Sequence, residues 1–317
     1  MSRRRLSRRG WLAGAALSVL GASGCASQTA ALRAGAAVGL PRRAELEQVP
    51  FFPQSGPNLC GPETLATVLQ AEGFAQTPAD LVPLVYLPGR HGSLQVEMLA
   101  AARRCGAVAV RLPASLHALC EEIAGGRAAV VLQNLGLSVA PLWHYAVAVG
   151  YDLDEGWMVL RSGAQRRQRL AMRTFEHTWA RSQYWAFVTV APGRLPRTAS
   201  EDEIVRAMLA FERVASPEAA VRAYAAAQTR WPDNLTLAMG LGNSLYAAGR
   251  KTDAARAFEA AARAHASAAA WVNLGVVALD LGQPQRALAA AREALALGGP
   301  WAEQARALLD RVQASQP

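Results

Sequence analysis

The sequence predicts two folded parts, an α+β domain followed by an all-α array of helical repeats. Between residues 49 and 196, helical periodicity comes first, and short β-branched or aromatic segments follow after Gly125 and Gly126. From residue 201 onward, alanine-rich helical segments recur at intervals of 33 and 34 residues. The 317 residues exceed what one hydrophobic core usually serves, so two domains are expected.

Residues 1–24 have the three parts of an export signal. Five arginines between Arg3 and Arg9 precede an apolar run over residues 11–20, which is too short to span a bilayer. The stretch at residues 7–12 resembles a twin-arginine export motif, and the stretch at residues 22–25 resembles a lipobox ending in Cys25. Cys25 is therefore the predicted lipidation site. Ala22 stands where lipoproteins usually carry Leu, so ordinary cleavage without lipid is the alternative.

The charge of the chain depends on this leader. Residues 1–24 hold five of the 33 basic residues and no acid, so the formal charge falls from +9 to +4 without them. This removes the main support for a nucleic-acid partner, and 52% hydrophobic residues exclude a wholly disordered chain. Residues 25–48 show neither helical nor strand periodicity and are predicted to be a tether. We expect a membrane lipoprotein of the cell envelope that faces the periplasm.

The predicted domain at 49–196 begins with an extended segment at 49–54. Leu65, Val68 and Leu69 share one face of a helix that Gly73 ends, and Pro83 bends or shortens the next helix. The expected helices are 61–71, 78–86, 93–105 and 115–124, and the expected strands are 128–133, 144–151, 157–161, 168–171 and 185–190. Helices before antiparallel strands predict two halves with a cleft between them.

The chemistry is concentrated around Cys60, where a loop becomes a helix. Free backbone N–H groups and the helix dipole at such a position favour the thiolate, which predicts a lowered pKa for Cys60. Gln54 lies six residues upstream and has an amide that suits an oxyanion. His144 opens a later apolar strand at the sheet rim, and a thiol nucleophile needs such a base to hold its proton.

Together, these residues resemble the double-glycine leader peptidases, a papain-like cysteine peptidase family best known from bacteriocin-exporting transporters. The resemblance covers about residues 49–191. It implies a papain-like fold and peptide hydrolysis through a thioester, with Cys60 as nucleophile, His144 as general base and acid, and Gln54 as oxyanion donor. No metal or organic cofactor is implied. No transporter membrane segment or ATP-binding motif follows, so the resemblance does not identify the substrate.

The chain departs from that family at the third catalytic position. An Asp is expected there to orient the imidazole, but the sequence reads Leu160-Arg161-Ser162-Gly163. Ser162 is the candidate in its place, since its hydroxyl is able to accept a hydrogen bond from the ring, although it supplies no negative charge. A degraded site that only binds peptides therefore stays open as an alternative.

Other polar residues have structural interpretations. Cys105 and Cys120 could form a disulfide in an oxidising compartment or remain as two buried thiols. His117 precedes Cys120 by three residues, but zinc would need two more ligands. The basic cluster at Arg161, Arg166, Arg167 and Arg169 is interpreted as solvated hairpin charges.

Residues 201–317 resemble tetratricopeptide repeats with a capping helix. Leu241-Gly242 recurs as Leu274-Gly275 after 33 residues, and Tyr224 is matched by Phe258 after 34. We expect repeats at 234–267 and 268–299, a degenerate one at 201–233 and a solvating helix near 301–314. Such an array offers a surface for a protein partner.

Two functions follow from these patterns. The preferred one is a lipid-anchored cysteine endopeptidase that cleaves an exported polypeptide, with the repeats recruiting the substrate or a partner. The alternative is a scaffold whose peptidase-like domain binds peptides without cutting them.

Overall fold

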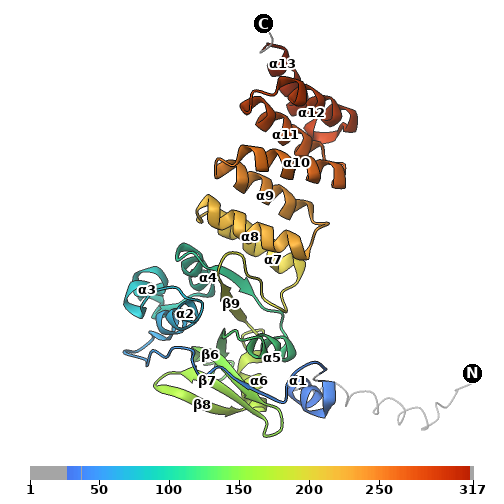
Figure 1. The fold of residues 1–317 in the computed structure, drawn as a ribbon. Coiled ribbons are helices and arrows are strands. Elements are labelled where there is room, and N and C mark those ends of the chain that lie inside the picture. The colour runs from blue at the N-terminus through green and yellow to red at the C-terminus, as the bar shows by residue number, and fades with distance from the viewer. Residues whose placement is uncertain (1–26, 37, 315–317) are drawn as a thin grey trace, which may run out of the picture.

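The computed structural model describes residues 27–36 and 38–314, which form an α+β domain and a helical array extending away from it (Figure 1). The predicted fold class, α+β followed by all-α repeats, is confirmed. The export signal and Cys25 lie outside the described residues. Within the described part of the chain, no helix has the length and apolar character needed to cross a bilayer.

The α+β domain is built on a seven-stranded antiparallel sheet. Its order is β4-β9-β5-β6-β7-β8, and β1 pairs with the end of β6 that β5 does not reach. The strands are β1 (Arg43–Glu45), β4 (Val108–Arg111), β5 (Ala129–Asn134), β6 (Trp143–Asp152), β7 (Trp157–Ser162), β8 (Gln165–Ala171) and β9 (Ala186–Val190). Strands β2 (Tyr86–Leu87) and β3 (Gly92–Ser93) form a separate pair. The sequence pattern missed β1 and β4 because three and four residues carry too little alternation.

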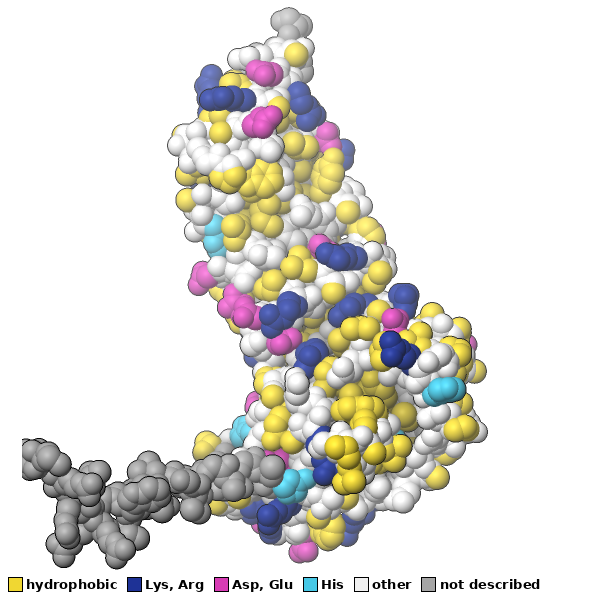
Figure 2. Space-filling view, turned by 180° about the vertical axis from the view of Figure 1, so that it is seen from behind, with side chains coloured by type: hydrophobic (Ala, Val, Ile, Leu, Met, Phe, Trp, Pro, Cys, Tyr) yellow, Lys and Arg dark blue, Asp and Glu magenta, His cyan; other side chains and the backbone are white. Residues whose placement is uncertain are grey.

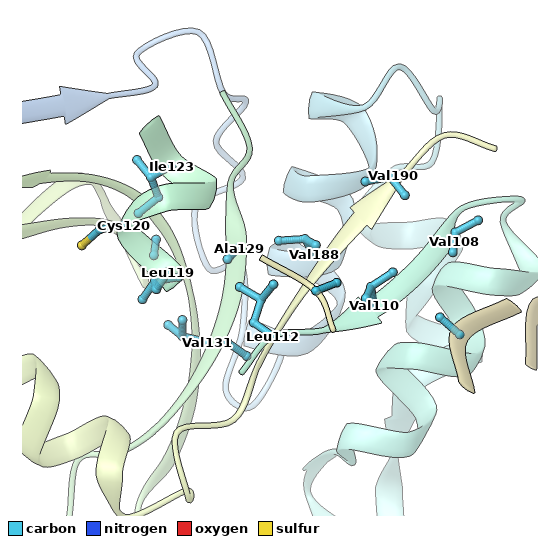
Figure 3. Close-up of a cluster of buried hydrophobic side chains, with 14 of the residues drawn as sticks. Val108, Val110, Leu112, Leu119, Cys120, Ile123, Ala129, Val131, Val188 and Val190 are labelled. Atoms are coloured by element: carbon cyan, nitrogen blue, oxygen red, sulfur yellow. The ribbon is translucent and has the colours of Figure 1, made fainter. Parts of the chain in front are cut away.

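Helices cover both faces of the sheet. One layer holds α2 (Cys60–Ala71), α3 (Pro78–Val85) and α4 (Gln95–Arg104); the other holds α5 (Leu116–Ala124) and α6 (Met172–Ala180). Neighbouring residues of a strand point to opposite faces, so Val130 packs with Leu65 while Val131 packs with Leu119 and Val188 (Figure 3). Helix α6 was not predicted, because its sequence lies between two strands without a helix start signal.

This division keeps two of the cysteines apart. Cys105 packs with the α2–α4 layer and Cys120 lies in the cluster on the opposite face of the sheet. Both are free thiols, so the disulfide that the sequence left open is not formed. Burial raises the pKa of both thiols, which makes them poor nucleophiles.

The predicted tether is wrong for the described residues before position 49. Helix α1 (Ser27–Ala31) lies against α5 and α6, Leu32 is buried in the core, and β1 extends the sheet. The backbone N–H groups of Gln28 and Thr29 donate to the Glu176 carboxylate at 3.1 and 2.7 Å. This segment is held by single buried residues at irregular spacing. A search of the sequence for regularly spaced apolar residues does not reveal such contacts.

We expect Glu176→Gln to loosen the N-terminal segment. Glu176 is 0% exposed, and the change replaces an oxygen that accepts a backbone N–H with an amide that donates. The free energy of unfolding should fall by about 1–3 kcal/mol. Urea unfolding and tryptic cleavage at Arg33 measure the effect against the exposed control Glu155→Gln. Unchanged cleavage at Arg33 would show that Glu176 does not hold the segment.

The helical array comprises seven α-helices among the described residues. They are α7 (Glu201–Glu212), α8 (Pro217–Arg230), α9 (Leu235–Ala247), α10 (Lys251–His265), α11 (Ala268–Asp280), α12 (Pro284–Leu297) and α13 (Ala302–Ala314). A Cβ on Gly242 would lie 2.5 Å from the Phe258 ring, and one on Gly275 would lie 2.3 Å from Leu308. The repeated glycines therefore permit close helix packing. Figure 2 shows basic and acidic side chains interspersed along the array.

The array is joined to the α+β domain by packing. Ile204, Met208 and Phe211 of α7 belong to the hydrophobic cluster that includes β4 and α5. Residues 196–200, which join the two parts, are held by hydrogen bonds: Thr198 N–H donates to Glu122, and Arg230 donates to the carbonyl of Pro196. The two parts therefore share a core.

Candidate active site

Cys60 is the first residue of α2 and lies at the end of an irregular loop. The residue before it, Leu59, has no side-chain oxygen that could cap the first N–H groups of the helix. The backbone N–H groups of Cys60, Gly61 and Tyr145 lie near enough to the thiol to act on its pKa, which they lower. Gly61 is required by packing, since a Cβ there would lie 2.2 Å from Ser93 Oγ.

The Cys60 thiol has a raised pKa, contrary to the sequence expectation. Burial is the main cause, and the negative charge of Glu63 adds to it. The three backbone N–H groups lower the pKa, but they do not outweigh desolvation. Cys60 is therefore a neutral thiol at pH 7.

His144 lies on β6 and directly precedes Tyr145, the residue whose N–H lies near the Cys60 sulfur. Its Nε2 is 2.9 Å from Ser162 Oγ at the end of β7, the position where an acid was expected. Burial lowers the pKa of His144, so its imidazole is neutral at pH 7. The structure thus brings His144 and Ser162 into contact, and Tyr145, the next residue of the same strand, lines the cleft with Cys60.

Gln54 is close to this group, but its amide is engaged. The Gln54 side chain donates to the Gly56 carbonyl at 2.9 Å, and its backbone N–H donates to Gly163 O at 3.0 Å. Gly163 directly follows Ser162, so the Gln54 loop is fixed beside the Ser162 end of β7. To serve an oxyanion, the amide would have to leave Gly56.

Glu63 is an important residue that the sequence reading missed. It lies one helical turn after Cys60, and its Oε1 accepts from Ser55 N at 2.7 Å and from Ser55 Oγ at 3.1 Å. Burial raises the pKa of Glu63. Its carboxyl fixes the loop that carries Gln54, and an acid on the buried face of a helix was the available signal.

Arg161 also differs from its expected role. Instead of being a solvated hairpin charge, it is buried, and its guanidinium donates to the carbonyls of Arg166, Glu47 and Val49. It therefore anchors the segment that leads into the Cys60 loop. Arg167 does lie at the surface, paired with Glu45 at 2.6 Å.

A cleft of about 570 Å³ opens at Cys60. Tyr145 and Ser93 line it beside the thiol, and farther out its wall includes Arg90, Leu94, Pro141, Leu142, Trp143 and Arg181. This size suits a few residues of an extended peptide. A second cavity of about 10 Å³ is lined by Cys60, Glu63 and Ser162 and has room for about one water molecule.

Metal ligation finds no support in the described part of the chain, where no three His, Cys, Asp or Glu side chains cluster. Among the described residues, the Cys60 thiol and the His144 ring form no hydrogen bond with each other: the thiol lines the cleft, and the ring, on a neighbouring strand, contacts Ser162. The chemistry that these residues would support is that of a thiol nucleophile with an imidazole base, once the ring reaches the sulfur.

Comparison with known proteins identifies the helical part. A family model described as tetratricopeptide repeat matches residues 206–269 and 239–300. The array of α7–α13 is a tetratricopeptide repeat region. This confirms the repeats expected from the sequence.

Solved structures resemble each half of the chain distantly. A Bacillus anthracis protein described as a C39-like peptidase covers 47% of this chain and 97% of its own, with 17% identity and a TM-score of 0.40. The type III secretion translocator chaperone SycD of Yersinia enterocolitica covers 36% of this chain and 92% of its own, with 16% identity and a TM-score of 0.34. No curated protein sequence matches the chain.

Proposed function

We propose that this protein is a lipid-anchored cysteine endopeptidase of the cell envelope, with Cys25 carrying the lipid and Cys60 the catalytic thiol. Its substrate is an exported polypeptide. The tetratricopeptide repeats, an architecture that commonly binds proteins, recruit the substrate or a partner.

One observation carries this proposal. The Cys60 thiol lies at a helix N-terminus and lines a cleft of about 570 Å³, and the strand beside it carries a neutral imidazole bonded to Ser162. Cys105 and Cys120, by comparison, pack in the two cores. Covalent catalysis by these residues requires the His144 ring, oriented by Ser162, to reach the Cys60 thiol.

The reaction would follow from this arrangement. As the Cys60 sulfur attacks the peptide carbonyl carbon, His144 takes the thiol proton, and the C–N bond breaks when His144 returns it to the leaving amine. The thioester on Cys60 is then hydrolysed by a water that His144 deprotonates. The backbone N–H groups at the start of α2 are available to the oxyanion, and Gln54 joins them if its amide turns away from Gly56.

The scaffold alternative has its own support. The raised thiol pKa weakens catalysis, and so does the fact that no carboxylate of the described residues is hydrogen-bonded to His144. A peptide would still fit the cleft, and the repeats would still bind a protein.

Mapping of protein N-termini in the cell envelope distinguishes these functions. Cells producing the wild-type chain should contain cleaved N-termini that disappear in Cys60→Ala cells. The control Cys105→Ala changes a cysteine outside the cleft, so the cleaved termini should persist. Identical termini in all three strains would support the scaffold.

A further inference from the structure

The loop between β5 and β6 is unusually apolar for a surface segment. Residues 135–143 read Leu-Gly-Leu-Ser-Val-Ala-Pro-Leu-Trp and include no charged side chain. Five of them are large hydrophobic residues exposed by 46% to 91%: Leu135, Leu137, Val139, Leu142 and Trp143. Exposed apolar patches of this kind mark interaction surfaces.

The backbone of this loop is well satisfied internally. Leu135 N–H donates to Leu142 O at 2.8 Å, and Asn134 Oδ1 accepts from the N–H groups of Gly136 and Leu142. Arg181 braces the base through the carbonyls of Asn134 and Gly136. The base of the loop is therefore a fixed hairpin, and it carries exposed apolar side chains.

The position of the loop indicates which environment that is. Helix α6 touches both segments: Glu176 holds α1, and Arg181, which directly follows α6, holds the base of the hairpin, the two residues lying about 8 Å apart along the helix axis. Cys25 precedes Ser27 by two residues, a reach of at most about 7 Å. A lipid on Cys25 would thus hold this side of the domain at the bilayer.

We propose that the hairpin at residues 135–143 inserts into the bilayer interface and orients the cleft toward the membrane surface. This rests on the lipid anchor of the proposed function. Trp143 suits the headgroup level, and Leu137 and Val139 supply the apolar contact. Pro141, Leu142 and Trp143 also line the cleft, so its mouth lies at the interface. The substrates are then polypeptides presented at the membrane surface.

Flotation with vesicles of phosphatidylethanolamine and phosphatidylglycerol tests this. The protein is the mature chain, residues 25–317, with Cys25→Ser so that no lipid contributes; it keeps every described residue. We expect vesicle binding that Leu137→Ser with Val139→Ser weakens by about tenfold or more. These two residues lie outside the cleft lining. The matched control is Val96→Ser with Val214→Ser, which changes exposed valines on other elements.

Each result is decisive. Binding that the hairpin variant loses and the control keeps supports insertion. Absence of vesicle binding, or equal loss in both variants, overturns it. If the hairpin variant changes only peptide cleavage or peptide affinity, the loop belongs to a polypeptide-binding surface and insertion is wrong. Cleavage of a soluble peptide by the unlipidated chain reports on the peptidase proposal separately, since it needs no vesicle.

Discussion

His144→Ala should lower the peptidase kcat/KM by about a thousandfold, while alkylation of Cys60 by iodoacetamide at alkaline pH stays unchanged. The reason is the charge state of the resting pair. Burial raises the pKa of Cys60 and lowers that of His144, so at pH 7 the proton remains on sulfur and the imidazole is neutral. His144 is then needed to move the proton during attack and has little part in forming a resting thiolate.

The pH dependence follows with a definite sign. His144 is a base only when neutral, and its pKa lies below its ordinary 6.5, so the acid limb of kcat/KM should fall below that pH. The Cys60 pKa lies above its ordinary 9.0, so alkylation should rise at higher pH than for a small free thiol. Stopped assays across pH measure both effects: a peptide substrate reports the acid limb of kcat/KM, and iodoacetamide reports the pH dependence of Cys60 alkylation.

Cys105 and Cys120 are also free thiols, so the Cys60→Ala variant measures their share of the alkylation, which is subtracted from the total. Rapid alkylation of Cys60 near pH 6 that His144→Ala abolishes would contradict the neutral pair and indicate a thiolate–imidazolium pair. Hydrolysis that survives His144→Ala would remove His144 from the mechanism.

The fold was predictable where the pattern is long. The helix at Cys60–Ala71 and the strand at Trp143–Asp152 carry many apolar residues in the right period, and the repeated glycines at 242 and 275 reveal the helical array. Short elements were not predictable. The three residues of β1 and the segment around Leu32 are held by tertiary contacts, which leave no periodic signature.

The sequence indicated candidate residues for the site, but it did not indicate the direction of the pKa shift of the thiol. Cys60, His144 and Ser162 follow from local motifs, and the structure brings His144 and Ser162 within 2.9 Å. The sign of the thiol pKa was not predictable, since a helix N-terminus lowers it while burial and Glu63 raise it. Which effect is larger depends on how deeply the fold encloses the sulfur, and one sequence does not show that.

Ser162→Ala should reduce kcat by about tenfold with KM little changed. The hydroxyl lies 2.9 Å from His144 Nε2 and is the polar contact that fixes the ring. Without it, the imidazole is free to turn away from the proton it must accept, and only the chemical step suffers. Because serine brings no charge, the loss should be smaller than the roughly 10⁴-fold loss seen when a triad carboxylate is neutralised.

Ser162→Asp and Ser162→Asn form a matched pair that separates charge from hydrogen bonding. The carboxylate should raise the pKa of His144, move the acid limb of kcat/KM to higher pH and increase kcat, because it stabilises the imidazolium formed during attack. The amide has nearly the same shape and lacks the charge, so it should leave the acid limb near its wild-type position. Thermal melting of each variant guards against loss of fold. If both variants shift the limb equally, geometry and not charge controls the base, and if neither Ser162→Ala nor Ser162→Asp changes kcat, Ser162 does not position His144.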